Sequence, residues 1–405
     1  MTLTITLVRH GESEANAAGL WQGQGDAVLS GEGREQAAAL GRRLDRSRYE
    51  RVISSDLVRA AGTASLAGFD PELLESWRET DLGMWDGLTF DEVRGGFIDD
   101  LRAIRRGDDV PFGRTGETID QFECRVVEAF DGLADEIAEG SAIVFTHGGV
   151  IDALVSRAIG RPSGRRAVPI ATNTSLTTFR GRPGRMRLVT FNDCGHLGRE
   201  EGFLAHQRAA GSPVIGFVRH GVTHANKEQR VQGQSGSGLH PEGADQARAF
   251  ASWYGPVDAV YSSPLERATE TAAFIANGTA LATSDDLAEM SFGDWEGLGY
   301  DEMLAHPDAK RIWSDGEDLP RGRNGESFGQ VQRRVTRFLE EAAVPAGKRV
   351  VAVSHGGTIL ALAAAIAGRG FEIARTVDTA GNARVSHVVI TETGPMLADY
   401  SVGPE

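Results

Sequence analysis

The chain carries one ordered series of short motifs twice. LVRHGESEAN at residues 7–16 returns as FVRHGVTHAN at residues 217–226, and each copy places Arg-His-Gly directly after an apolar run. Five further pairs follow in the same order: residues 21–33 with 231–243, 53–65 with 261–273, 78–87 with 288–297, 115–130 with 324–339, and 143–154 with 351–362. Matching residues stay 208 to 210 positions apart; His220, for example, follows His10 by 210. Self-similarity at a fixed distance predicts a duplicated domain, so the fold of this chain is built twice.

The length agrees with two domains. A chain of 405 residues leaves about 200 for each copy, which is enough for an independent hydrophobic core. We predict a first domain at residues 1–198, a linker at residues 199–212, and a second domain at residues 213–405. The linker falls in a polar stretch that is broken by glycines.

Local patterns predict the same fold class for both copies. In the first copy, residues 2–8, 51–54 and 142–146 are short apolar, β-branched runs typical of strands, and residues 32–45, 57–67 and 118–139 have helical composition and spacing. The second copy repeats this order, and each copy closes with a predicted hairpin, at residues 175–191 and 386–400. Because strands alternate with helices, we predict two tandem three-layer α/β domains, each with a mostly parallel sheet flanked by helices.

Several polar residues stand where predicted strands end. His10 and His147 each follow a strand directly, and Arg59 lies in the first turn after residues 51–54. Ligands of such sheets bind beyond the carboxyl ends of the strands, so these three side chains should meet at one edge. The second copy repeats the arrangement with three matching residues: His220, His355 and Arg267.

Charge and cysteine content exclude several classes of partner. The net charge of −15 argues against nucleic acid and anionic membranes, because both require a basic surface. Two cysteines are too few for a disulfide framework, which favours a reducing, cytoplasmic setting. We see no signal peptide and no stretch of about 20 apolar residues that would span a membrane. No clustered set of Asp, Glu and His predicts a metal, and we predict no cofactor.

The motif series resembles a known family. RHGE followed by Asn, SSxxxRAxxT, ExxxGxWxG and a late strand ending in HGG are together similar to the histidine phosphatase superfamily, also called phosphoglycerate mutase-like, and the resemblance covers nearly the whole chain twice. It implies the phosphoglycerate mutase-like fold and the metal-independent hydrolysis of phosphate esters of small metabolites through a phosphohistidine. The resemblance also implies the site residues: His10, Glu79, His147, Arg9, Asn16 and Arg59 in the first copy, and His220, Glu289, His355, Arg219, Asn226 and Arg267 in the second.

The implied roles agree with the chemistry of a phosphate monoester. An arginine fork matches phosphate oxygens, which suits Arg9 and Arg59, and Asn16 would add a neutral donor. The resemblance makes His10 the nucleophile, lets His147 stabilise the oxygens, and assigns Glu79 the protonation of the leaving group. Their partners in the second copy would do the same.

The two copies also differ. The first has Asp26 and Asp56 where the second has Gly236 and Pro264, and the segment between the acidic residue and the GET or GES motif differs most. In this family that segment covers the pocket, so the resemblance implies that the two sites accept different leaving groups.

Two alternatives stay open. One is phosphoryl transfer of the phosphoglycerate mutase type, which is disfavoured because each copy is too short for the insertion typical of those mutases. The other makes one copy a non-catalytic domain that binds a phosphorylated ligand or a protein and regulates its neighbour.

The remaining notable residues have structural interpretations. We expect Trp85 and Trp295 to pack in the core near the sites, and Cys124 to be a small core residue of its helix. Four arginines indicate an exposed helix face: Arg94, Arg102, Arg105 and Arg106.

Overall fold

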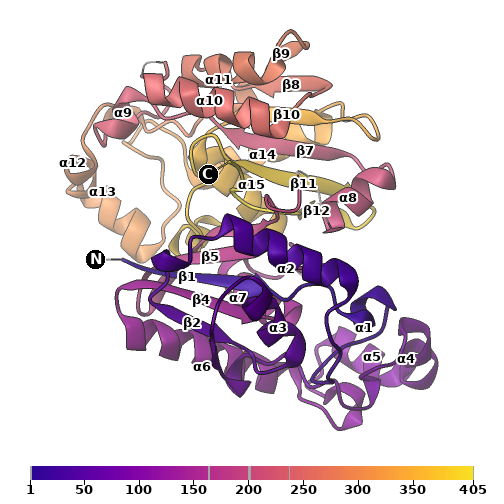
Figure 1. The fold of residues 1–405 in the computed structure, drawn as a ribbon. Helices are drawn as coiled ribbons and strands as arrows, with labels where there is room; N and C mark the ends of the chain where they lie inside the picture. The colour runs from indigo at the N-terminus through magenta and orange to yellow at the C-terminus, as the bar shows by residue number, and fades with distance from the viewer. Residues whose placement is uncertain (1, 163–164, 199–201, 237, 405) are drawn as a thin grey trace. The chain divides into compact units, whose positions relative to one another are not determined.

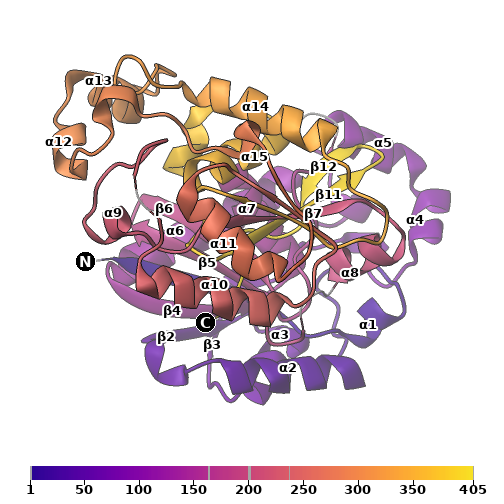
Figure 2. The same cartoon turned by 90° about the horizontal axis from the view of Figure 1, so that it is seen from above.

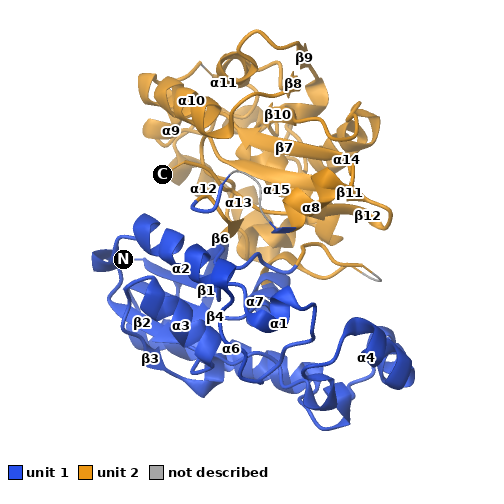
Figure 3. Ribbon diagram, turned by 45° about the vertical axis from the view of Figure 1, so that its right-hand side comes forward, with its two compact units in different colours: residues 1–157, 170–188, 196–202 blue, residues 158–169, 189–195, 203–405 orange. Residues whose placement is uncertain are grey.

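The computed structural model describes residues 2–162, 165–198, 202–236 and 238–404. The chain divides into two compact units, residues 1–157, 170–188 and 196–202 and residues 158–169, 189–195 and 203–405 (Figure 3). The segment predicted as a linker contains helix α8 (Gly202–Ala209), whose Leu204 packs with buried Val214 and Val389 of the second unit. Residues 199–201 of that segment lie outside the described residues.

The first sheet has six strands in the order β3-β2-β4-β1-β5-β6 (Figure 1). Their bounds are Glu72–Leu73 for β3, Arg51–Ser54 for β2, Gly140–Thr146 for β4, Leu3–Arg9 for β1, Leu176–Arg182 for β5 and Arg185–Asp193 for β6. The first four strands run parallel, and β5 pairs antiparallel with β1. The histidines after β1 and β4 therefore emerge from neighbouring strands at the same edge of the sheet.

The second sheet repeats this topology in the order β12-β11-β7-β10-β8-β9. Its strands are Gly394–Leu397 for β12, Val385–Thr391 for β11, Val214–Arg219 for β7, Val350–Ser354 for β10, Ala259–Ser262 for β8 and Leu281–Thr283 for β9. Strands β9, β8, β10 and β7 are parallel, while β11 and β12 are antiparallel. All five residues of β10 are buried, as expected of a parallel strand covered on both faces. The predicted fold class is confirmed in both copies.

The described residues of the first copy contain seven α-helices. They are α1 (Glu14–Ala17), α2 (Gly31–Arg43), α3 (Val58–Leu66), α4 (Phe90–Gly96), α5 (Ile98–Arg106), α6 (Ile119–Ile137) and α7 (Gly148–Ile159). Of these, α2, α3 and α6 match the three that were predicted. Capping residues explain two of their starts: the hydroxyl of Ser30 accepts from Gly33 N before α2, and Thr118 and Gln121 form a capping box before α6. Helix α3 packs on β4, where Ala64 meets Phe145 in the core.

The second copy has the matching helices. They are α9 (His224–Lys227), α10 (Pro241–Tyr254), α11 (Glu266–Ala276), α12 (Tyr300–Leu304), α13 (Pro307–Lys310), α14 (Phe328–Glu341) and α15 (Gly356–Ala367). Helices α10 and α11 cover one face of the sheet, and α14 and α15 cover the other (Figure 2). The first face is filled by a cluster that includes Phe250, Ala272 and Val353. Within the described residues, no helix is both long and apolar enough to cross a membrane.

The segments between the acidic residue and the GET or GES motif fold differently in the two copies. In the first, α4 and α5 lie over a cluster built on Leu82, Trp85 and Val93. In the second, α12 and α13 are followed by a π-helical turn, Arg311–Asp315, and the cluster contains Trp295 and Ile312. We call these segments, residues 88–114 and 298–323, the first and second caps.

For the residues that were given structural interpretations, the structure confirms the burial of two tryptophans and the exposure of four arginines, and it corrects one assignment. Trp85 and Trp295 are buried, and the four arginines that were predicted to be exposed, Arg94, Arg102, Arg105 and Arg106, are exposed. Cys124, by contrast, is exposed, so its assignment to the core was wrong. The buried face of α6 includes Phe122 and Val126. Cys124 is two positions from each of them, and residues two positions apart point to opposite sides of a helix.

Candidate active sites

The structure brings the two predicted histidines of each copy together. His10 N donates to the carbonyl of Thr146, the last residue of β4, at 2.9 Å. The rings of His10 and His147 are 5.2 Å apart between centroids, and those of His220 and His355 are 5.1 Å apart. All four side chains are buried. Each pair of histidines directly follows two neighbouring parallel strands, β1 and β4 or β7 and β10, so the pairing of these strands sets the distance between the rings.

Two arginines flank the first pair of histidines. The Nη2 and Nη1 atoms of Arg59 donate to the carbonyls of Gly23 at 2.6 Å and Gly25 at 2.9 Å. Its Nε donates to Nε2 of His10 at 3.3 Å, and Arg9 is anchored by a bond from Nη1 to the carbonyl of Ala171 at 2.6 Å. The buried Nε of Arg9 makes no hydrogen bond within the described residues, so it is a donor available to an anion.

The second copy repeats this arrangement with one difference. Arg267 donates to the carbonyls of Gly233 at 2.6 Å and Ser235 at 3.2 Å, and Arg219 donates to Ala380 O at 2.8 Å. The Nε atoms of both arginines are buried and make no hydrogen bond in the described part of the chain. Each site thus presents guanidinium donors that an oxyanion could satisfy.

Burial and positive charge control the protonation of the histidines. Burial lowers the pKa of His10 well below its ordinary value of 6.5, and the charges of Arg59 and Arg9 lower it further. The pKa of His220 is lowered in the same way by burial, Arg219 and Arg267. The pKa values of His147 and His355 are also shifted well below 6.5, mainly by burial. Burial likewise lowers the pKa of Arg59 to about 10, which leaves its guanidinium charged at neutral pH.

The tautomer of the first histidine in each pair follows from its hydrogen bonds. Nδ1 of His10 lies 2.7 Å from the carbonyl oxygen of Gly11, and Nδ1 of His220 lies 2.7 Å from that of Gly221. Because a carbonyl oxygen can only accept, Nδ1 carries the proton and Nε2 keeps its lone pair. A neutral imidazole with an unprotonated Nε2 has the form that a nucleophile requires.

The acidic residues reach the same edge of each sheet. The carboxylate of Glu79 accepts from the backbone N–H groups of Thr80 and Gly149, both at 2.9 Å. Gly149 lies in the first turn of α7, the helix that begins directly after His147. Glu289 repeats this geometry with Met290 N at 2.8 Å and Gly357 N at 3.2 Å. Both acids are close enough to the arginines to raise the pKa of Arg9 and Arg219 by their negative charge, against the larger effect of burial.

The predicted asparagines start short helices beside the sites. Asn16 closes a capping box with Ser13 at the start of α1, and its Nδ2 donates to Gln22 Oε1 at 3.4 Å. Asn226 closes the matching box with Thr223 at the start of α9. In each copy the side-chain oxygen is therefore used for capping.

Glycines let the loop after each histidine touch a helix. A Cβ atom on Gly33 of α2 would lie 1.9 Å from the carbonyl oxygen of Glu12, and one on Gly243 of α10 would lie 2.0 Å from that of Val222. A side chain at either position would collide with this backbone oxygen, which explains why the last residue of GEG and of PEG is glycine.

Sequence reasoning assigned no role to several residues that hold the sites, although two of them, Ser55 and Thr63, stand in the motif SSxxxRAxxT. His147 Nε2 lies 2.8 Å from the hydroxyl of Ser55, Gly11 N donates to Thr63 Oγ1 at 2.9 Å, and Glu12 N donates to Gln36 Oε1 at 2.9 Å. The second copy repeats these bonds through three matching residues: Ser263, Thr271 and Gln246. Asn173 and Asn382 also donate to the backbone of the two sites. One feature of the sequence could have identified these residues: each is identical in the two copies at the common spacing of 208 to 210 residues.

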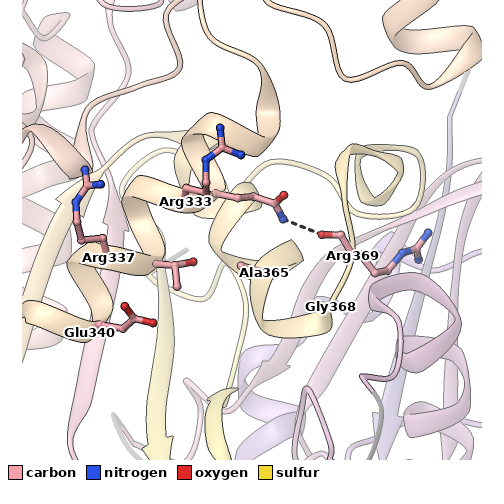
Figure 4. Close-up of a pocket in the computed structure, with 8 residues that line it drawn as sticks. Arg333, Arg337, Glu340, Ala365, Gly368 and Arg369 are labelled. Atoms are coloured by element: carbon pink, nitrogen blue, oxygen red, sulfur yellow. Dashed lines mark hydrogen bonds between the residues drawn. The ribbon is translucent and has the colours of Figure 1, made fainter.

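Other features of the described residues lie apart from these sites. A cavity of about 370 Å³ is lined by residues of α14 and α15 and by Gly368 and Arg369 (Figure 4). It contains none of the predicted site residues. Across residues 2–162, 165–198, 202–236 and 238–404, no three His, Cys, Asp or Glu side chains form a group that could hold a metal ion.

Comparison with known proteins gives consistent matches. The histidine phosphatase superfamily (branch 1) matches the chain twice, at residues 5–194 and 215–402. A putative phosphoserine phosphatase 2 of Hydrogenobacter thermophilus is 37% identical over 164 residues, covering 38% of this chain and 79% of that protein. A metal-independent phosphoserine phosphatase of Arabidopsis thaliana is 33% identical over 207 residues, covering 49% of this chain and 85% of that protein. Among solved structures, phosphoglycerate mutase from Thermus thermophilus is 32% identical with a TM-score of 0.36, covering 43% of this chain and 91% of that one.

Proposed function

Because this chain belongs to the histidine phosphatase superfamily, we propose that each of its two domains hydrolyses phosphate esters of small metabolites through a phosphohistidine intermediate. The protein is a phosphoric monoester hydrolase, in keeping with its family and its phosphatase relatives. One observation carries the proposal: each domain pairs a neutral imidazole, with Nε2 unprotonated, with two buried guanidinium groups.

The first domain binds the phosphate through charged and neutral donors. Arg9 and Arg59 hold the phosphate oxygens, and Asn16 and His147 add donors as charge shifts during transfer. The guanidinium groups are held by backbone carbonyls before substrate arrives, so little reorganisation is needed. Most of the catalytic effect comes from this positioning and charge, because the transferring phosphoryl group carries negative charge on its oxygens.

Hydrolysis proceeds in two steps. Nε2 of His10 attacks phosphorus as the bond to the ester oxygen breaks, and Glu79 gives its proton to the departing alkoxide. Water then attacks the phosphohistidine and passes a proton to Glu79, which releases inorganic phosphate and restores the lone pair on Nε2. The second domain performs the same steps with its matching residues: Arg219, Arg267, Asn226, His220, Glu289 and His355.

The two sites differ in the leaving group that they accept. Their phosphate-binding residues match, whereas the caps and the residues at positions 56 and 264 do not. The proposed substrates are small phosphorylated metabolites, and we place the reaction in the cytoplasm, where a chain with two cysteines and no disulfide framework would keep them reduced.

Trapping the intermediate tests this proposal. Rapid quench with ³²P-labelled ester should leave acid-labile phosphate on His10 or His220, and a chelator should leave phosphate release unchanged. The single variants H10A and H220A assign the label to a domain. Strict dependence on an added divalent metal, or the absence of label in a chain that turns over, would refute the phosphohistidine step.

The same experiment separates the alternatives. Transfer of label to a second phosphate acceptor, without release of inorganic phosphate, would indicate a mutase. A domain that binds the ester but never becomes labelled would be a regulatory module.

A further inference from the structure

We propose that Asn173 and Asn382 are positioning residues, which orient the imidazoles of His10 and His220 by fixing the peptide group that follows each of them. The inference rests on the proposed function, since it concerns how the nucleophile is presented. Neither asparagine belongs to the motif series, and each reaches its site from more than 160 residues away along the chain.

In the first domain, side chains hold both ends of the peptide group between His10 and Gly11. Asn173 Nδ2 donates to the carbonyl of His10 at 2.9 Å, and Gly11 N donates to Thr63 Oγ1 at 2.9 Å. The next peptide group is held through Glu12 N, and its carbonyl is the acceptor for Nδ1 of His10. The orientation of the ring therefore depends on two peptide planes that are fixed by remote side chains.

The second domain has the same bonds. Asn382 Nδ2 donates to the carbonyl of His220 at 2.9 Å, and Gly221 N donates to Thr271 Oγ1 at 3.1 Å. Nδ1 of His220 again lies 2.7 Å from Gly221 O. Because the caps and parts of the cores differ between the domains, the persistence of this one geometry points to a requirement of the site.

The residue after each asparagine has a rare backbone conformation. Thr174 has φ of +57° and Ala383 has φ of +50°. In this conformation, Thr174 N donates to the carbonyl of Arg9 at 3.0 Å, and Ala383 N donates to that of Arg219 at 3.0 Å. Non-glycine residues incur a strain energy there, and such strain persists where the surrounding structure enforces it. One short segment thus holds the Arg-His backbone through a main-chain and a side-chain bond.

The consequence for catalysis follows from the geometry. Without the amide, the carbonyl of His10 loses a hydrogen bond, and the peptide plane can rotate together with Gly11 O, the acceptor of the ring proton. Nε2 would then leave its line of attack, and a displacement of about 1 Å can cost about 100-fold in rate. The arginines proposed to bind phosphate are anchored by other carbonyls. To Asn16, Asn173 Nδ2 makes only a longer bond, at 3.4 Å to Oδ1, and it leaves Nδ2 of Asn16 untouched. Ground-state binding should therefore change little.

The test uses the full chain with one site silenced. N173A is made in the H220A background and N382A in the H10A background, and each is assayed with p-nitrophenyl phosphate. We expect kcat to fall by about 10- to 100-fold, while KM and the inhibition constant of inorganic phosphate change by less than about threefold. N173D and N382D, which keep the shape but lose the donor, should be as slow as the alanine variants.

A matched control separates positioning from stability. Asn192 also donates from Nδ2 to a backbone carbonyl, that of Ala398 at 3.0 Å, and has no role in the proposed site. N192A should leave kcat unchanged in both backgrounds. If kcat of N173A or N382A stays within twofold of its parent, if the aspartate variants recover it, or if phosphate affinity falls together with kcat, the inference is wrong. If the parent chains release no phosphate from any ester, the proposed function fails and this inference fails with it.

Discussion

At one place on the rim of each site, next to the serine that contacts the second histidine, the first domain has a charged pair where the second has two apolar residues. Next to Ser55, the carboxylate of Asp56 accepts from Nε of Arg78 at 2.7 Å and also from Nη2. The second domain has Pro264 and Ala288 at these positions. The proposed phosphate-binding residues match between the domains, so the residues at these two positions are a difference that a leaving group could sense.

The caps extend this contrast. Phe112 of the first cap packs against Trp85, with 5.5 Å between the ring centroids. Its counterpart is Arg321, whose buried guanidinium lies 4.5 Å from the ring centroid of Phe371. Burial lowers the pKa of Arg321 to about 10, so it remains charged. The second cap therefore keeps a cation in its core where the first has an aromatic ring.

The cores differ as well. In the second domain, His387 Nδ1 lies 2.7 Å from Asp399 Oδ2, its Nε2 lies 3.0 Å from the hydroxyl of Tyr254, and all three residues are buried. At the corresponding register of the first sheet, Thr178 faces Thr6 with 3.4 Å between their hydroxyl oxygens. The comparison teaches that one strand order can be built on different core residues while the polar residues at the strand ends stay the same.

The largest expected effect comes from removing one proposed nucleophile. H10A and H220A should each lower turnover at their own site by about 10⁴-fold or more, since the covalent step is lost. Each variant should keep the substrates of the other domain, as measured by phosphate release from a panel of esters. Loss of all activity in a single variant would show that the sites are not independent.

The proposed acids come next. E79Q and E289Q, each with the other site silenced, should slow hydrolysis of an alkyl phosphate by about 10²- to 10⁴-fold. The effect on p-nitrophenyl phosphate should be much smaller, because nitrophenolate departs without a proton. Comparison of kcat/KM for the two esters tests this. Equal losses on both would make the glutamate a structural residue.

The hydrogen bonds among buried His387, Asp399 and Tyr254 should make the stability of the second domain more sensitive to a core substitution than that of the first. H387A leaves Asp399 without its side-chain partner and should cost about 3 kcal/mol of the free energy of unfolding. T178A, at the matching position, should cost about 1 kcal/mol or less. Urea unfolding of the two full-length variants measures the difference, and equal costs would contradict this view of the cores.

Acid should destabilise both domains to a similar extent. The pKa values of the four site histidines are lowered in the folded protein, so the unfolded chain binds more protons below pH 6.5. Their contribution is complete above pH 6.5 and is lost as pH falls, by about 1.4 kcal/mol per pH unit for each histidine until its folded pKa is reached. Urea unfolding between pH 7 and pH 5 measures this slope. The double variant H10A/H147A should lower it, and an unchanged slope would mean that these histidines are protonated in the fold.

The smallest effect is expected at the charged rim. D56A removes a partly exposed ion pair and should change the free energy of unfolding by less than about 1 kcal/mol. It should alter the ranking of esters hydrolysed by the first domain and leave that of the second unchanged. A constant ranking in the H220A background would show that this ion pair does not contact the leaving group.

Sequence reasoning succeeded where information was local or repeated. The strand ending at Arg9, the helix containing Arg59 and the strand before His147 could be predicted from apolar runs and spacing, and their convergence followed from the geometry of parallel sheets. It failed for Cys124, because composition alone did not reveal which face of α6 is buried. It also missed Asn173 and Asn382, since nothing in their local sequence distinguishes them from loop residues.

By itself the sequence determined that this protein has two copies of one α/β domain, with matching polar residues at the ends of matching strands. Tertiary structure decided the chemical state of those residues. Three features of the first site come from segments far apart in the chain: the burial that lowers the pKa of His10, the carbonyls that anchor Arg59, and the amide of Asn173 that donates to the His10 carbonyl. The physical reason is that desolvation and hydrogen-bond direction depend on which atoms surround a group in space, and a linear motif specifies only the group itself.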